Sequence, residues 1–466
     1  MKGVQKLGLL ILAALMLAGV AACDRAGGSA RQGRGERWPG PEPQDLGGLV
    51  FKIADNTNFR FLPRDTELGT PMGDLKHTIM ESIMEDFNVT FDVVRITEND
   101  MLNQLTPAVM AGDLFAHIII STTWAFGGLI SAGLLGDISA VPTLNLDSDL
   151  WMRHVHRATT VRGEVLATAG IFEHWDRASV VVFQKSLWNQ LNLPDPYELV
   201  RRGEWTWDRF EEFAVLAAQD LTGDGVVDNI NDRWGMAVIP DDFMRATVLS
   251  MGGRFFDFHP VTGRLYSPMA TPEGIAIADW LRYFSLIPGA WYRGPGQNNR
   301  TEMFINRRAL FMPHDLHIWE VVRAMDDDFG ILPYPKRNAE QPEYLSVASH
   351  NAMLIGIPIT NNQLEETGII MEALAARFAP VREMQRAELE DIVLRSDEDI
   401  EMLDYIIPNL ACDIGFIMAI AGPVWNTPMG TLYNYTFNHT VNDFASEIES
   451  RRMAMEVAIN EVFFNE

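Results

Sequence analysis

A run of oxygen donors at 220–228 has the spacing of a calcium-binding loop. Donors at positions 1, 3, 5, 7 and 9 of such a loop would be Asp220, Thr222, Asp224, Val226 through its backbone carbonyl, and Asp228. Gly225 stands where the loop must turn sharply. The twelfth position holds Asn231 instead of a bidentate glutamate, with Asp232 one residue late. Two interpretations stay open: a weak structural calcium site, or a turn that only solvates its own charges.

Pairs of carboxylates could also do catalysis, since glycosidases place two of them about 5–9.5 Å apart. With 63 acidic residues, the sequence leaves such a pair open. The sequence contains no G-x-S-x-G elbow, no H-E-x-x-H, no Walker loop and no C-x-x-C, and these absences remove several catalytic classes. We therefore expect a protein that is not an enzyme, with a secreted glycosidase as the main alternative.

The net charge of the chain narrows the class of partner. The formal net charge is −26 at pH 7, and the resulting field repels nucleic acids and anionic ligands. A neutral solute is therefore the expected partner, and no nucleic acid is expected.

The chain has two cysteines, Cys23 and Cys412, and is large enough to need no disulfide. We interpret Cys412 as a buried structural thiol.

The elements that would position these residues follow from apolar periodicity. In the first third of the chain, strand-like apolar runs alternate with helical repeats, which predicts a mostly parallel sheet covered by helices. Strands are expected at 49–54, 89–96, 116–120, 165–168 and 179–183. Helices are expected at about 75–87, 99–110, 124–132, 243–251, 272–284, 364–378 and 442–464. The last two strands follow each other without a helix between them, so the chain can pass from one lobe to the other there. The pattern alone predicts an α/β protein with two lobes.

The N-terminus has the features of an exported protein. Two lysines precede an apolar run at 7–20, which is too short for a membrane span and is typical of a secretory signal. The run ends in Val-Ala-Ala followed by Cys23, which resembles the lipobox of bacterial lipoproteins. This resemblance implies that residues 1–22 are a signal peptide and that Cys23 is acylated, so that lipid chains hold the protein to the cell membrane on its extracytoplasmic side. Residues 23–48 are rich in Gly, Pro, Arg and Ser and should form a flexible linker.

Several segments resemble the family of bacterial extracellular solute-binding proteins that includes the maltodextrin-binding and multiple-sugar-binding proteins. The closest match is GEWTWDRFEEFAVLAAQDLTGDGVVDNINDRWG at 203–235. The segment AHIIISTTWAFGGLISAGLLGDIS at 116–139 resembles the family's strand, ligand loop and following helix. Further segments lie at 163–170, 180–188 and 304–319. Together with the lipobox, they cover most of the chain in the family's order.

The resemblance implies a type II periplasmic-binding-protein fold, in which two α/β lobes joined by crossing strands enclose a ligand cleft. Lobe 1 would comprise 49–172 with 350–411, and lobe 2 would comprise 173–349 with 412–466. The implied function is that of the monomeric solute-binding lipoprotein of an ABC importer. It would capture a small neutral solute, a mono- or oligosaccharide, and deliver it to the transmembrane permease, with no cofactor apart from the calcium considered above. The alternatives are the secreted glycosidase and a surface glycan-binding protein without a transporter.

A sugar site needs flat apolar faces that stack on a pyranose ring and polar groups for its hydroxyls, because a buried unpaired hydroxyl costs ~1–3 kcal/mol. We expect these contacts from aromatic and polar residues at the strand ends and crossings. They are Asp55, Asn56, Trp124, His174, Trp175, Asp176, His314, Asp315 and Trp425. Core packing is the alternative for each tryptophan, since the chain has twelve and few can line one cleft. The maltodextrin binders carry a charged side chain at the place of Trp124, so a different ligand is expected here.

Replacing the cysteine of the lipobox tests the anchor. Cys23→Ser should release the protein from the membrane fraction and leave its fold intact, because the linker at 23–48 separates the folded body from the lipid. Cell fractionation with immunoblotting measures the release, and the melting temperature of the released protein is the control for folding. Retention of Cys23→Ser in the membrane fraction would refute the lipoprotein interpretation.

Overall fold

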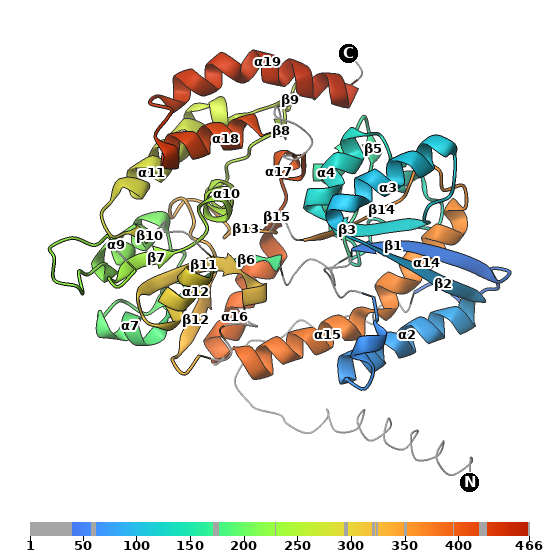
Figure 1. The fold of residues 1–466 in the computed structure, drawn as a ribbon, viewed down its shortest axis with the longest axis horizontal. Coiled ribbons are helices and arrows are strands. Elements are labelled where there is room, and N and C mark those ends of the chain that lie inside the picture. Colours follow the sequence, from blue (N-terminus) through green and yellow to red (C-terminus); the bar gives the residue numbers. More distant parts are fainter. Residues whose placement is uncertain are drawn as a thin grey trace, which may run out of the picture. The chain divides into compact units, whose positions relative to one another are not determined.

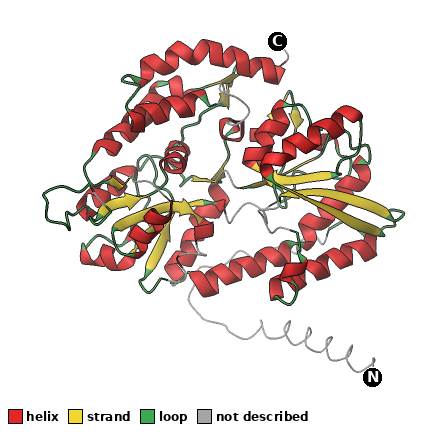
Figure 2. Cartoon of the chain, in the orientation of Figure 1, coloured by secondary structure: helices red, strands yellow, loops and turns green. Residues whose placement is uncertain are grey.

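The computed structural model describes residues 40–56, 62–170, 177–228, 230–292, 297–318, 322, 325–348, 352–394, 396–418 and 426–464. The predicted leader and Cys23 lie outside these residues. In the described part of the chain, the longer strands form two separate sheets with helices packed around each (Figure 1), and Figure 2 shows the mixed α/β architecture that the sequence predicts. No helix in the described part is both long enough and apolar enough to cross a bilayer.

The first sheet combines strands from the start of the chain with one that returns much later. Its strands, in order across the sheet, are β14 (Met353–Gly356), β3 (Ile118–Thr122), β1 (Leu49–Asn56) and β2 (Val89–Ile96). β1 runs parallel to β2 and β3, with α2 (Pro71–Phe87) and α3 (Glu98–Ala111) as crossovers, whereas β14 is antiparallel to β3. Every residue of β3 and β14 is buried, which explains why these strands are continuous runs of apolar and small residues.

Threonine caps start two helices directly after strands of this sheet. Thr97 follows β2, and its hydroxyl accepts a hydrogen bond from the backbone N–H of Asp100 at 3.3 Å, which starts α3. Thr122 ends β3, and its hydroxyl accepts from the backbone N–H of Ala125 at 3.3 Å, which starts α4 (Thr123–Ser131). The N-termini of α3 and α4 therefore lie at the carboxyl ends of β2 and β3, the two strands that flank β1, on the edge where open α/β sheets bind ligands.

The second sheet has an aromatic core. Its strands, in order, are β10 (Trp291–Tyr292), β7 (Trp234–Ala237), β11 (Ala309–Asp315), β6 (Ser179–Gln184) and β12 (Phe329–Leu332). β7 is parallel to β10 and β11, and β6 is antiparallel to β11 and β12. Trp205 is fully buried, with its ring centroid 6.4 Å from that of Phe213 and 6.0 Å from that of Phe311, and its Nε1 donates to the carbonyl of Pro333 at 2.9 Å. Core packing thus accounts for this tryptophan.

Helices from the middle of the chain pack with the C-terminal helices. They are α10 (Pro240–Ser250), α11 (Pro272–Leu286), α18 (Thr427–Tyr433) and α19 (Phe444–Phe464). α19 contacts α11 and α18, and α18 contacts α10 (Figure 1). Other helices are α5 (Arg153–Thr159), α7 (Lys185–Gln190), α8 (Pro196–Arg201), α9 (Trp207–Ala217), α12 (Gln297–Ile305), α14 (Leu364–Arg377), α15 (Ala379–Glu388), α16 (Asp397–Ile406) and α17 (Ile414–Met418). Short strand pairs are β4 (Thr160–Val161) with β5 (Glu164–Val165), and β8 (Asp257–Phe258) with β9 (Leu265–Tyr266).

Segments that pass between the two sheets run side by side. β13 (Ser346–Val347) pairs in parallel with β15 (Leu410–Ala411). The next residue, Ala348, forms an antiparallel bridge with Ala178, just before β6. The carbonyl of Ala178 also accepts a hydrogen bond from the backbone N–H of Leu316, just after β11, at 2.9 Å. These backbone pairs hold the crossing segments against one another and against the second sheet.

The second lobe boundary differs from the predicted one. The sequence-based division placed 350–411 in lobe 1, but α16 packs on β12 of the second sheet. Asp399 of α16 is fully buried there, where its carboxylate accepts hydrogen bonds from Lys185 at 2.7 Å, from Tyr197 at 2.7 Å and from the backbone N–H of Ile331 at 3.0 Å. An amphipathic pattern shows that a helix buries one face but not which sheet it covers, so residues 397–411 could not be assigned from their sequence.

The segment after β15 contacts both parts of the protein. α17 packs against α4 and α5 of the first lobe, although the sequence-based division placed 412–466 in lobe 2. Asp413, just before α17, is buried, and its carboxylate accepts a hydrogen bond at 2.9 Å from the backbone N–H of Phe255 in the second lobe. The segment at 413–418 is therefore a contact between the lobes rather than a member of either.

Removing the buried carboxylate of α16 should destabilise the fold. Asp399→Ala would leave Lys185, Tyr197 and the N–H of Ile331 without their shared acceptor, and breaking a buried ion pair in this way costs about 3–5 kcal/mol. Urea denaturation measures this loss in the free energy of unfolding. Asp404→Ala on the same helix is the matched control, since that side chain is 74 % exposed and its ion pair contributes little. Equal midpoints for the two variants would contradict the assignment.

Candidate functional site

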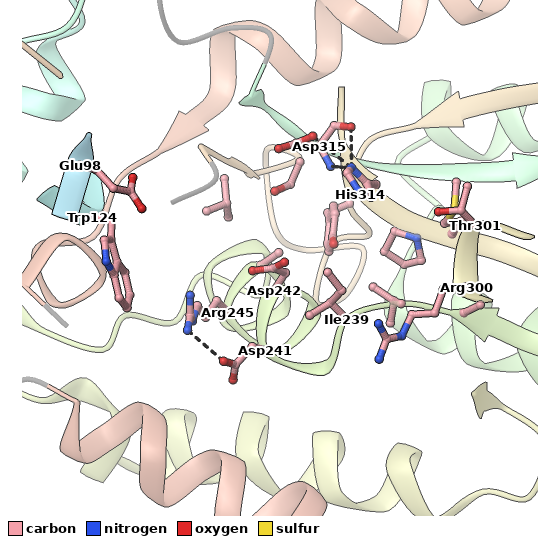
Figure 3. A pocket seen from close by; sticks show the side chains of 18 residues that line it. Glu98, Trp124, Ile239, Asp241, Asp242, Arg245, Arg300, Thr301, His314 and Asp315 are labelled. Atoms are coloured by element: carbon pink, nitrogen blue, oxygen red, sulfur yellow. Dashed lines mark hydrogen bonds and ion pairs between the residues drawn. The ribbon is translucent and has the colours of Figure 1, made fainter. Parts of the chain in front are cut away.

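A cavity of about 560 Å³ is lined by residues of both lobes. Glu98 and Trp124 approach it from the first lobe, and the start of α10, the end of β11 and part of α12 approach it from the second (Figure 3). Val347 of β13 also lines it, so the crossing segments border the cavity. Its volume is in the usual range for small-molecule sites, roughly 300–1,000 Å³.

On the first-lobe side of the cavity, the hydroxyl of Thr122 links the starts of α3 and α4. Thr122 caps α4 and at the same time donates its hydroxyl hydrogen to Oε2 of Glu98, the first residue of α3, at 2.8 Å. Trp124, two residues after Thr122, is partly exposed and lies in the first turn of α4. An indole and a carboxylate are thus presented together on this side (Figure 3).

The second-lobe side carries an imidazole next to a buried carboxylate at the end of β11. Nδ1 of His314 lies 2.9 Å from the backbone N and 3.1 Å from Oδ1 of Asp315, and the guanidinium of Arg177 lies 3.6 Å from Oδ2. Burial opposes ionisation of Asp315, but the hydrogen bond and charge of His314, together with the charge of Arg177, lower the pKa of its carboxyl to about 2. Burial alone would lower the pKa of His314, because it disfavours the charged imidazolium. The hydrogen bonds and the negative charge of Asp315 outweigh this effect, so the pKa of His314 is raised. Asp315 is therefore an ionised, fixed group at neutral pH.

Helix α10 supplies further charged groups. Asp241 and Arg245 form an ion pair at 3.2 Å within the first turns of the helix, and Asp242 lies beside them on the cavity (Figure 3). Arg300 and Thr301 of α12 line the opposite part. These residues give the cavity many hydrogen-bond donors and acceptors around one partly exposed aromatic ring.

The structure brings some of the predicted ligand contacts together and separates others from the cavity. Trp124, His314 and Asp315 all line it. Asp55 and Asn56 follow the predicted strand but are completely buried. His174, Trp175, Asp176 and Trp425 lie outside the described residues.

The burial of Asp55 and Asn56 has a simple cause. Asp55 forms an ion pair with Arg95 at the same level of the neighbouring strand β2, and Asn56 donates its side-chain amide to the hydroxyl of Ser121 at 3.3 Å. Both side chains therefore join strand ends of the first sheet to each other. They are not among the residues that line the cavity.

Several cavity residues were not predicted from the sequence, among them Glu98, Asp242, Arg245 and Arg300. Acidic residues in the first turn of a helix are common, because they interact favourably with the helix dipole. Nothing in the pattern therefore marked Glu98 or Asp242 as a ligand contact. The only available signal was position, since Glu98 follows β2 as Trp124 follows β3.

The acidic loop satisfies its carboxylates with its own backbone. Asp220 accepts hydrogen bonds from the N–H groups of Gly223 at 2.6 Å and Gly225 at 2.7 Å. Asp232 is fully buried and accepts from the N–H of Leu221 at 3.0 Å and of Asp228 at 3.2 Å. Among the residues that the structure describes, no group of three or more His, Cys, Asp or Glu side chains is arranged to hold a metal ion. Calcium binding by this loop stays a prediction.

Comparison with known proteins gives no match at the level of sequence and many at the level of structure. No protein-family model and no curated protein matches the chain. The cyclic α-maltosyl-1,6-maltose binding protein from Arthrobacter globiformis is 14% identical, with a TM-score of 0.59 over 90% of this chain and 100% of its own. The maltose/maltodextrin-binding domain MalE from Bdellovibrio bacteriovorus bound to maltotriose is 12% identical, with a TM-score of 0.56 over 88% of this chain and 100% of its own.

UgpB from Mycobacterium tuberculosis in complex with glycerophosphocholine is also similar, at 12% identity and a TM-score of 0.57 over 89% of this chain and 99% of its own. Identities this low establish a common fold rather than a common ligand. The two sheets, the crossing segments and the cavity between them therefore give this chain the type II periplasmic-binding-protein fold of the maltodextrin-binding proteins.

Proposed function

We propose that this protein is the solute-binding lipoprotein of an ABC importer, which captures a small carbohydrate in the cavity and delivers it to the permease as a monomer. The observation that carries the proposal is the composition of the cavity, which has Glu98 and Trp124 on one lobe and His314, Asp315 and Asp242 on the other. A solute that contacts both sides favours the closed arrangement of the lobes, whereas a solute bound to one side would shift nothing.

The chemistry of the cavity suits a polyhydroxylated solute. Trp124 offers a flat apolar face, and the charged groups of α10, α12 and β11 offer acceptors and donors for several hydroxyls. Solved structures with the same fold include proteins bound to maltotriose and to cycloalternan, which supports a carbohydrate ligand.

Two of the four carboxyl groups on the cavity are held in a way that does not suit the acid of a glycosidase. A glycosidase needs one carboxyl whose pKa is raised so that it can protonate the leaving group. The pKa of the Asp315 carboxyl is instead lowered to about 2, and Asp241 is paired with Arg245. These two groups are suited to holding a ligand by hydrogen bonds rather than to general acid catalysis.

Replacing the aromatic face should weaken binding without unfolding the protein. Loss of one stacking surface costs about 1–3 kcal/mol, so Trp124→Ala should lower the affinity for the solute roughly 5- to 150-fold. A thermal-shift screen of mono- and oligosaccharides finds the solute, and calorimetry then measures its dissociation constant. The matched control is Trp205→Ala, which removes a core indole and should reduce the free energy of unfolding by about 3–5 kcal/mol.

Two results would count against this assignment. If Trp124→Ala lowered stability as much as Trp205→Ala and left affinity unchanged in the folded fraction, Trp124 would be a core residue. If no carbohydrate raised the melting temperature of the wild-type protein, the proposed class of solute would be wrong, since a bound solute stabilises by ~2.7 kcal/mol at one hundred times its dissociation constant.

The acidic loop at 220–228 is the proposed structural calcium site. Calcium should raise the melting temperature of the wild-type protein, and Asp224→Ala should abolish this increase while solute binding persists. Asp224 is the informative position because its side chain is exposed and accepts a hydrogen bond from the N–H of Val226 at 3.1 Å, while the contacts of Asp220 and Asp232 hold the rest of the loop. Identical melting curves in calcium and in chelator would reduce the loop to a plain turn.

A further inference from the structure

The cavity carries more negative than positive charge. Among its described lining residues are four carboxyl groups, on Glu98, Asp241, Asp242 and Asp315, and two guanidinium groups, on Arg245 and Arg300. The lining charge is therefore −2, or −1 when His314 is protonated. Since the whole chain has a net charge of −26, no long-range field compensates for this local excess.

Most of the charges on the second-lobe side are matched within the protein. Asp241 pairs with Arg245 at 3.2 Å, and Asp315 is held by His314 and by Arg177 at 3.6 Å. The negative charge of Asp242 acts on His314 and on Arg300. These groups can therefore form hydrogen bonds with the hydroxyls of a solute, and they do not require the solute to be charged.

Glu98 on the first lobe is different. Within the part of the chain that the structure describes, its carboxylate accepts a hydrogen bond from the neutral hydroxyl of Thr122, and no lysine, arginine or histidine forms an ion pair with it. The side chain is half-buried on the cavity, on the same side as the indole of Trp124. A carboxylate beside an aromatic face is a combination that attracts an ammonium group, through charge pairing and through the cation–π interaction.

The helix N-termini near the cavity do not reverse this preference. A helix N-terminus favours an anion, but the first turn of α3 carries Glu98 and Asp100, and the first turn of α10 carries Asp241 and Asp242. The first turn of α4 carries no acidic residue, but its cap Thr122 donates its hydroxyl hydrogen to the carboxylate of Glu98. The protein's own carboxylates thus already lie at the N-termini of these three helices. An anionic solute would have to displace or approach these groups.

From this arrangement we infer that the solute is an amine-bearing carbohydrate whose protonated amine binds between Glu98 and Trp124. The inference rests on the proposed function, because it names the class of solute for the same cavity. Ring hydroxyls bind the paired charges of the second lobe, and the ammonium provides the positive charge that the first-lobe side lacks.

Matched sugars test the inference directly. The purified protein is titrated by calorimetry with glucosamine and glucose, galactosamine and galactose, and mannosamine and mannose, and with β-1,4-linked trimers of glucosamine, N-acetylglucosamine and glucose. Each set differs only in the group at C2, which is an ammonium, an acetamide or a hydroxyl. At least one ammonium member should bind about tenfold or more tightly than its neutral counterparts, because hydrogen bonds to charged groups are about twice as strong as neutral ones.

The variant Glu98→Gln separates the charge of this residue from its structural role. Glutamine keeps an oxygen that can accept the hydrogen bond from Thr122, so the fold should persist while the preference for the ammonium member is lost. Glu81→Gln on the exposed face of α2 removes the same charge away from the cavity and should leave the preference unchanged.

The outcomes distinguish this inference from the proposed function. Neutral sugars that bind as tightly as amine-bearing ones would overturn the inference and leave the proposed function standing. A preference for the ammonium member that persists in Glu98→Gln would also overturn it, because the amine would then bind elsewhere. If none of the sugars bound, both the inference and the carbohydrate part of the proposed function would be wrong.

Discussion

The geometry of the cavity depends on the backbone pairing between segments that cross from one sheet to the other. Ser346 pairs with Leu410, Val347 pairs with Ala411, and Ala348 bridges to Ala178. These pairs join three distant parts of the chain, so a change in the relative orientation of the two sheets must be absorbed at or next to this small ladder. Val347 lines the cavity directly, so the element that joins the lobes also borders the site. A solute of the proposed kind, bound across the cavity, would therefore act on the place where the lobes are connected.

Much of the first sheet could be predicted from the sequence, because its strands and helices alternate and each has a clear end signal. Thr97, Thr122 and Asn88 cap helices and are of residue types that favour such positions. The polar and aromatic residues that follow the strands could be named from the sequence. Trp124 was identified in this way, and it lines the cavity. The same rule failed for Asp55, because the residue opposite it on β2 is Arg95 and the two side chains pair.

Features that depend on contacts between distant segments could not be predicted. Nothing in the pattern of α16 indicates that Asp399 binds Lys185 and Tyr197 of the second lobe, so the lobe boundary was misplaced. Similarly, Glu98 gains its place on the cavity from a hydroxyl on another element, Thr122. A periodic pattern indicates which face of a helix or strand is buried. It does not indicate which other element packs against that face.

The pairing of β14 with β3 has a consequence for how the protein is made. β3, with the sequence Ile-Ile-Ile-Ser-Thr, is buried throughout, and one of its edges is covered by β14, whose residues 353–356 are synthesised long after it. Until that late segment has been synthesised, an apolar strand edge is open to pairing with other chains, which makes nascent fragments prone to aggregation. The order of strands in the sheet thus delays completion of the first sheet until most of the polypeptide is present.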